Sequence, residues 1–138
     1  VFKMSLELNK TIEFVIHFAG LKSVAESVIR PGLYWENNVN GTINLLKVME
    51  KYNCRNIVFS SSATVYKAKS DAPLFENDIC EPVNPYGNTK LTIEKLLKDI
   101  YNSDPSEWRI ASLRYFNPVG AHESGLLGEN ALGKPNNI

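Results

Sequence analysis

The 138-residue sequence lacks several features that would each define a class of protein. Its 15 basic and 15 acidic residues leave no formal net charge, which argues against a nucleic-acid-binding surface or an acidic disordered tail. No apolar run approaches the length that crosses a membrane, and the start of the chain shows no signal-peptide pattern. We therefore expect a cytoplasmic protein that binds neither nucleic acid nor a membrane.

Cysteine is scarce as well. The sequence contains only Cys54 and Cys80, and their separation does not match the ligand spacing of a metal site. We expect both to be reduced thiols in a reducing compartment, with no bound metal. What remains after these exclusions is a chain of ordinary apolar content whose length suits one globular domain.

Three short runs rich in β-branched and aromatic residues predict strands at residues 12–18, 56–62 and 110–116. Two longer segments between them carry apolar residues at helical spacing. This alternation predicts an α/β fold with a parallel sheet and right-handed crossovers. Residues 67–85 are expected to form a polar connection, and the tail from residue 117 a loop. The first helical stripe consists of Ile43, Leu46, Met49 and Tyr52, and the second of Ile93, Leu96, Leu97, Ile100 and Tyr101.

Ligands bind beyond the carboxyl ends of the strands in an open parallel sheet. Small or polar residues follow all three predicted strands, in segments 18–22, 60–64 and 116–120. This pattern indicates one shared crevice, although strand ends also need turn residues. His17, inside the first run, is expected to be a hydrogen-bonded core residue rather than a catalyst.

Tyr86 and Lys90 form the one Tyr-x-x-x-Lys pair of the sequence. Residues four apart share a helix face, and Asn84 with Pro85 predicts that a helix begins there. A nearby cation and the positive end of the helix both favour a phenolate, which can then act as a base. Ser62, at the end of the middle strand, could relay the proton. With six tyrosines and eleven lysines this spacing arises readily by chance, so the case depends on the surrounding residues.

Longer blocks of sequence add a family resemblance. Ser60-Ser61-Ser62 after a buried strand, followed by Tyr86 and Lys90, resembles the extended short-chain dehydrogenase/reductase family. Within that family the sequence is most similar to the UDP-glucose (UDP-galactose) 4-epimerases, over nearly the whole chain and in the family's order. The similar blocks are residues 15–22, 37–42, 59–66, 84–90, 113–122 and 135–137.

The resemblance implies a fold and a reaction. The fold would be a partial NAD-binding, Rossmann-like doubly wound parallel sheet, with three strands and their crossover helices. The reaction would interconvert UDP-galactose and UDP-glucose by transient oxidation at sugar carbon 4, with NAD as the cofactor. Tyr86 would remove the proton of the 4-hydroxyl, Lys90 would lower the Tyr86 pKa and bind the nicotinamide ribose, and Ser62 would bond the reacting oxygen.

The resemblance also assigns binding positions and a partner. A homodimer of the full-length protein is expected, because proteins of the family often dimerise through helices like the two predicted here. The positions that match family contacts to NAD are Phe18, Ala19, Gly20, Lys22, Asn37, Ser60, Tyr86, Lys90 and Phe116. Those that match contacts to the UDP-sugar are Ser62, Tyr86, Asn117 and Asn137.

One element of the family is missing. The family opens with a Gly-x-x-Gly-x-x-Gly turn that lets the backbone approach the cofactor pyrophosphate, and no such turn follows a strand here. We therefore expect residues 1–138 to be part of an epimerase/dehydratase domain, without its glycine-rich amino-terminal half and most of the substrate domain. The strand at residues 12–18 would then have an open edge, which predicts poor solubility of the chain alone.

Two other interpretations stay open. One is a non-catalytic remnant that keeps the fold and binds no cofactor, because the glycine-rich turn is missing. The other is a related sugar-nucleotide dehydratase. Dehydratases of the family usually carry an Asp-Glu pair where this chain has Ala63 and Thr64, which argues against elimination chemistry.

Overall fold

The computed structural model describes residues 1–7, 10–67, 73–120 and 122–126 of the chain. It contains a three-stranded parallel sheet in which β2 (Asn56–Ser62) lies between β1 (Val15–His17) and β3 (Arg109–Tyr115). The predicted α/β fold is therefore confirmed. The helices of the described residues are α1 (Phe2–Glu7), α2 (Val24–Ile29), α3 (Pro31–Tyr34), α4 (Gly41–Lys51) and α5 (Pro85–Ser103), with a π-helical segment at Trp35–Asn40 and a 3-10 turn at Ala63–Val65.

Two strand boundaries differ from the prediction. The pattern predicts a strand at residues 12–18, whereas the pairing covers only Val15 to His17. At the amino end the reason is that β2 begins at Asn56, so residues 12 and 13 have no β2 residue opposite them. At the carboxyl end β2 continues to Ser62, and the pairing does not explain why β1 stops at His17. The third strand begins and ends one residue earlier than predicted, because it pairs residue for residue with β2.

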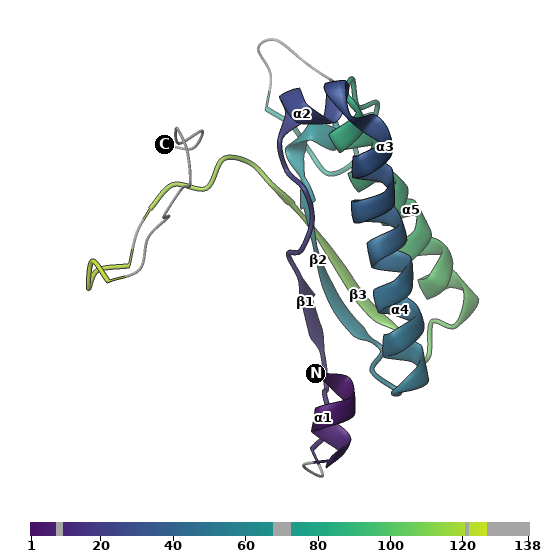
Figure 1. The fold of residues 1–138 in the computed structure, drawn as a ribbon. Helices are drawn as coiled ribbons and strands as arrows, with labels where there is room; N and C mark the ends of the chain where they lie inside the picture. Colours follow the sequence, from purple (N-terminus) through teal and green to yellow (C-terminus); the bar gives the residue numbers. More distant parts are fainter. Residues whose placement is uncertain (8–9, 68–72, 121, 127–138) are drawn as a thin grey trace.

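The long helices α4 and α5 lie side by side along one face of the sheet (Figure 1). Both predicted helical stripes contribute to the core on this face, although Tyr101 at the end of the second stripe is exposed. The opposite face is open, and Ile16, Leu113 and Tyr115 are exposed there. The buried core cluster consists of Leu46, Met49, Cys54, Ile57, Phe59, Ile93, Leu97 and Trp108.

The start of α5 is defined by a cap and a close contact. Asn84 has extended backbone angles and its Oδ1 accepts a hydrogen bond from the Gly87 N–H at 2.8 Å, which confirms the predicted N-cap. Gly87 faces the 3-10 turn so closely that a Cβ atom there would lie 2.6 Å from the carbonyl oxygen of Thr64. Glycine thus allows the first turn of α5 to sit against the end of β2.

His17 is a satisfied core residue, as predicted. Its side chain is buried, and its Nε2 lies 2.9 Å from the hydroxyl oxygen of Thr42 on α4. Burial and the nearby Lys90 lower the pKa of His17, which therefore stays neutral at physiological pH.

Candidate active site

An open cleft of about 590 Å³ lies at the carboxyl ends of the three strands. It has the size and place expected of a ligand site in an open parallel sheet. Seven of the residues singled out from the sequence line it, and they come from segments far apart along the chain. These seven are Phe18, Lys22, Ser60, Ser62, Tyr86, Phe116 and Asn117.

Tyr86 enters this cleft from the first turn of α5. Burial is the largest influence on its phenol and raises the pKa of Tyr86 above its ordinary value, while a hydrogen bond with Ser62 lowers that pKa. The Ser62 oxygen already accepts hydrogen bonds from Thr64, at 3.2 Å from the backbone N–H and 3.0 Å from the hydroxyl. The Ser62 proton is therefore left to donate to Tyr86, which favours the phenolate.

Lys90 lies below the cleft rather than on its wall. It is 5% exposed, and its Nζ donates a hydrogen bond to the Ser60 carbonyl oxygen at 2.7 Å. The same nitrogen lies 4.8 Å from the centre of the Phe59 ring and 5.8 Å from that of Tyr86. Burial lowers the pKa of Lys90 to about 8. Near neutral pH this ammonium is therefore close to its titration point.

The electrostatic prediction for the pair needs a correction. The sequence predicts that Lys90 and the helix dipole lower the pKa of Tyr86, whereas in the structure that pKa is raised. The physical reason is that the half-buried phenol loses hydration. The Lys90 Nζ lies 5.8 Å from the centre of the Tyr86 ring and donates its hydrogen bond to the Ser60 carbonyl oxygen. Ser62, not Lys90, is the group that counteracts burial.

Three other residues matched to family positions lie away from the cleft surface. Asn37 is exposed on the π-helical segment and lines a separate depression on the helix surface. Ala19 and Gly20 lie in the turn after β1 without lining the cleft. Gly20 has φ +156° and lies so close to Asn38 that a Cβ would approach the Asn38 Oδ1 to 3.1 Å. Asn137 lies outside the described residues.

The sequence reasoning missed the role of Asn38, which is 3% exposed. Its side chain accepts from the Leu21 N–H at 2.8 Å and donates to the Leu21 carbonyl at 3.0 Å. It also donates to the Thr89 hydroxyl on α5 at 3.3 Å. The amide thus ties the turn after β1 to the helix that carries Tyr86. No local pattern signals this role, because Leu21 and Thr89 are distant from Asn38 in the sequence.

Tyr34 is a second residue that the sequence did not reveal. It is fully buried, and its ring meets the Tyr86 ring edge to face, with centroids 6.5 Å apart. Its hydroxyl donates to the Glu26 carboxylate at 2.9 Å. The hydrogen bond fixes the Tyr34 ring, and the edge-to-face contact of that ring holds one side of the Tyr86 ring.

The described residues contain no group of three or more side chains able to hold a metal ion. None of their helices is long and apolar enough to span a membrane. The side chains gathered in the cleft are instead hydroxyls, aromatic rings and a lysine. They suit proton transfer and the binding of polar, ring-containing molecules.

Comparison with known families gives a match over residues 4–132 to the NAD dependent epimerase/dehydratase family. The chain belongs to this family. Among members with a curated name, it is 58% identical over 124 residues to UDP-glucose 4-epimerase 2 of Oryza sativa subsp. japonica. The identity is the same over the same length with a bifunctional UDP-glucose 4-epimerase and UDP-xylose 4-epimerase of Pisum sativum. These alignments cover 90% of the chain but only 30% and 35% of the relatives.

Solved structures of epimerases share the backbone fold of this chain. The UDP-glucose 4-epimerase of Bifidobacterium longum in complex with NAD+ and UDP is 51% identical, with a TM-score of 0.86 over 96% of this chain. The Stenotrophomonas maltophila enzyme with bound NAD and formylated UDP-arabinopyranose is 44% identical, with a TM-score of 0.89 over 99% of the chain. In both comparisons the chain spans 40% of the epimerase chain.

Proposed function

We propose that this chain carries the proton-transfer half of an NAD-dependent 4-epimerase that interconverts UDP-galactose and UDP-glucose. The observation that supports this best is the convergence of Tyr86 and Ser62 in the cleft, with Lys90 beneath them. Relatives that carry the epimerase name are 58% identical over most of the chain. Because the chain spans about a third of their length, the activity belongs to the protein that contains it.

The cleft fits a nicotinamide cofactor as far as its residues are described. Phe18 and Lys22 offer an aromatic ring and a cation on one wall, and the Ser60 backbone lies on the floor. The volume, about 590 Å³, suits part of a dinucleotide. When bound, NAD supplies the hydride acceptor at sugar carbon 4, and return of that hydride to the other face inverts the carbon.

The residues of this chain have separate roles in the proposal. Tyr86, as the phenolate, removes the proton of the sugar 4-hydroxyl and becomes a neutral phenol. Before this transfer the Ser62 hydroxyl donates a hydrogen bond that stabilises the phenolate, and after it the same hydroxyl bonds the reacting oxygen. Lys90 supplies positive charge under the ring and holds the Ser60 carbonyl. Asn117, at the mouth of the cleft, binds the UDP part. Proton transfer of this kind contributes roughly 10²–10⁴ to the rate.

Product identity tests the proposal. The protein expressed from its complete open reading frame is purified, its bound NAD is measured, and it is incubated with UDP-galactose. We expect bound NAD and conversion to UDP-glucose, with a large loss in a Ser62→Ala variant. A 4-keto-6-deoxy product would assign the protein to the dehydratases. Absence of both cofactor and turnover would make it a non-catalytic relative.

Two further assignments accompany the proposal. Cys54 and Cys80 are both free thiols, which supports a cytoplasmic, reducing location. A shallow apolar groove with Ile43, Leu96 and Ile100 runs between α4 and α5, and it supports a homodimer through these helices. Sedimentation at several concentrations would show a dimer, and a monomer at all of them would refute it.

A further inference from the structure

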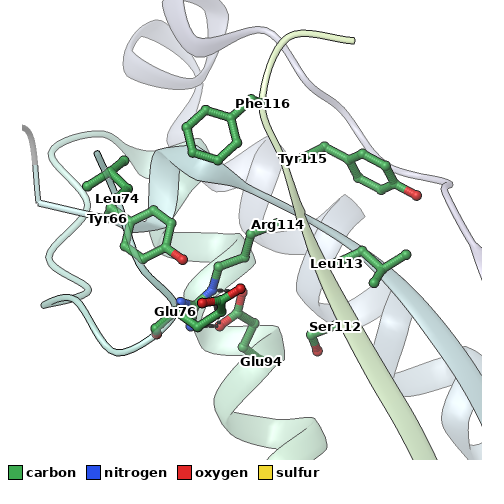
Figure 2. Close-up of a pocket in the computed structure, with 9 residues that line it drawn as sticks. All are labelled: Tyr66, Leu74, Glu76, Glu94, Ser112, Leu113, Arg114, Tyr115 and Phe116. Atoms are coloured by element: carbon green, nitrogen blue, oxygen red, sulfur yellow. Dashed lines mark hydrogen bonds and ion pairs between the residues drawn. The ribbon is translucent and has the colours of Figure 1, made fainter. Parts of the chain in front are cut away.

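An ion pair joins α5 to β3 beside a second cavity of about 540 Å³, which does not include Tyr86 or Ser62 (Figure 2). Arg114 donates from Nε and Nη2 to the Glu94 carboxylate at 3.0 and 2.8 Å. The two side chains are only 22% and 11% exposed. A guanidinium held by a carboxylate through two parallel hydrogen bonds fixes direction as well as distance.

The same two side chains reach two further segments. Glu94 Oε1 accepts a hydrogen bond from the Ser61 hydroxyl on β2 at 2.5 Å. Arg114 Nη1 donates to the Glu76 carbonyl oxygen at 3.0 Å, and the guanidinium carbon lies 4.8 Å from the Tyr66 ring centre. One polar network therefore connects β2, β3, α5 and the connection between Tyr66 and α5. Figure 2 shows the part of it formed by Glu76, Glu94 and Arg114.

Ser61, one of the three anchor points of this network, also lines the cleft, and the other two lie within four residues of a site residue. Ser61 is buried and bonds Glu94, and it lines the cleft together with Ser60 and Ser62. The neighbouring site residues are Ser60 and Ser62 on β2, Lys90 one helical turn before Glu94 on α5, and Phe116 two residues after Arg114.

A second ion pair shows what sets this one apart. Lys67 and Glu81 are also 2.8 Å apart, but their side chains are 56% and 62% exposed and they join residues within one connection. Exposed pairs of this kind contribute little to stability and hold neither side chain in one position. The Glu94–Arg114 pair, by contrast, is largely buried and joins α5 to β3, and Glu94 also bonds Ser61 on β2.

We propose that Glu94 and Arg114 are positioning residues, whose ion pair sets α5 against the carboxyl ends of β2 and β3 and so holds Tyr86 at Ser62. The kinetic part of this inference rests on the proposed epimerase function. Its geometric part does not, because the position of Tyr86 relative to Ser62 is a property of the chain itself.

Glu94→Gln in the complete protein is the first variant, because it keeps the shape and the acceptor for Ser61 but removes the charge. We expect kcat per folded molecule to fall about tenfold to hundredfold, because small misplacements of reacting groups slow a reaction by about this much. KM should change little. Arg114→Gln should act alike, and the double variant should be no worse than either single variant, because both break one interaction. Glu81→Gln is the matched control and should leave turnover unchanged.

Titration of the Tyr86 phenol separates positioning from plain stability. The phenol is followed by NMR of ¹³C-labelled tyrosine and assigned with Tyr86→Phe. If Glu94→Gln separates Tyr86 from Ser62 while the phenol stays buried, the midpoint moves to higher pH, since that hydrogen bond lowers the Tyr86 pKa. A phenol that instead moves into water titrates at lower pH, because burial raises its pKa. An unchanged midpoint and an unchanged kcat, with only a lower melting temperature, would overturn the proposal.

Two provisions keep the test decisive. If Glu94→Gln does not fold, Glu94→Asp and Arg114→Lys retain the charges while breaking the two-point geometry, and the same shifts are expected. The phenol titration needs no sugar. A protein that fails to epimerise UDP-galactose would refute the proposed function, while the Tyr86 midpoint would still decide whether the ion pair positions the phenol.

Discussion

The two halves of α5 hold the same sheet by different means. Its amino half makes polar contacts, with Tyr86 at Ser62, Lys90 at the Ser60 carbonyl and Glu94 at Arg114. Its carboxyl half packs through apolar side chains, of which Leu97 is 1% exposed. The helix therefore has two tasks along its length: its amino half positions groups of the candidate site, and its carboxyl half packs the core.

Physical chemistry explains why the tasks separate. A hydrogen bond contributes only about 0.5–1.5 kcal/mol net, but it is directional and can place an oxygen atom where a proton must go. Apolar burial contributes about 25 cal/mol per Å² without fixing direction. We therefore expect changes in the amino half to affect turnover most, and changes in the carboxyl half to affect stability most.

Leu97→Ala should give the largest loss of stability. It leaves a cavity in the core beside Ile93 and Trp108, and such changes lower the free energy of unfolding by about 2–5 kcal/mol. Turnover per folded molecule should stay unchanged. Urea unfolding with activity measurements on the complete protein checks both, with Lys98→Ala on the exposed face as the control. A loss of turnover equal to that of an active-site change would erase the distinction between the halves.

The next largest effect should come from Lys90, whose titration should make the free energy of unfolding depend on pH. Its folded pKa of about 8 lies below its ordinary value of 10.5. Between these values the unfolded chain holds a proton that the folded chain lacks, so the free energy of unfolding rises with pH. The full rise is about 3–4 kcal/mol, at about 1.4 kcal/mol per pKa unit, and most of it falls between pH 8 and 10.5.

Lys90→Met should remove this rise, whereas Lys98→Met, on the exposed face, should retain it. Unfolding measured from pH 7 to 10 compares the three proteins. A wild-type protein whose stability does not change over this range would show that Lys90 keeps an ordinary pKa.

Gly87→Ala should affect both stability and turnover. A Cβ would lie 2.6 Å from the Thr64 carbonyl and 2.8 Å from the Pro82 Cβ, so the first turn must move. We expect a loss of about 1–3 kcal/mol in stability together with a loss of turnover, because Thr64 also holds Ser62. Gly41→Ala is the control, since no atom lies within 4 Å of a Cβ there. Turnover that survives Gly87→Ala would show that the site tolerates a shift of this turn.

Asn84→Ala should give the smallest effect. It removes the cap on the Gly87 N–H, for which a loss of about 1 kcal/mol is typical. Asn84→Asp keeps an acceptor and should retain most of that stability. Thermal melts of the three proteins check the order, and equal stability of the alanine and wild-type proteins would contradict it.

Local patterns predicted much of this molecule. Strand composition, apolar periodicity and the Asn84-Pro85 cap are local signals, and they led to the parallel sheet, both long helices and the start of α5. The shortening of β1 at its amino end was not predictable, because it depends on where the neighbouring strand begins.

Some residues of the candidate site could likewise be predicted from local sequence, and others could not. Tyr86 and Ser62 were found from spacing and strand-end position, and the structure brings them into one cleft. Asn38 was missed, because its contacts to Leu21 and Thr89 join segments distant in sequence. The pKa of Tyr86 was misjudged for a related reason, since burial is set by the whole fold and no local pattern reports it.

The most direct test of the account compares the same chemical change at the two ends of α5. Tyr86→Phe and Tyr101→Phe each remove one hydroxyl, from the cleft and from the exposed end of the helix respectively. Turnover of UDP-galactose per folded molecule should fall by about 10²–10⁴ in Tyr86→Phe and stay at the wild-type level in Tyr101→Phe. A Tyr86→Phe protein that turns over within a few-fold of wild type would contradict the assignment of Tyr86 as the base.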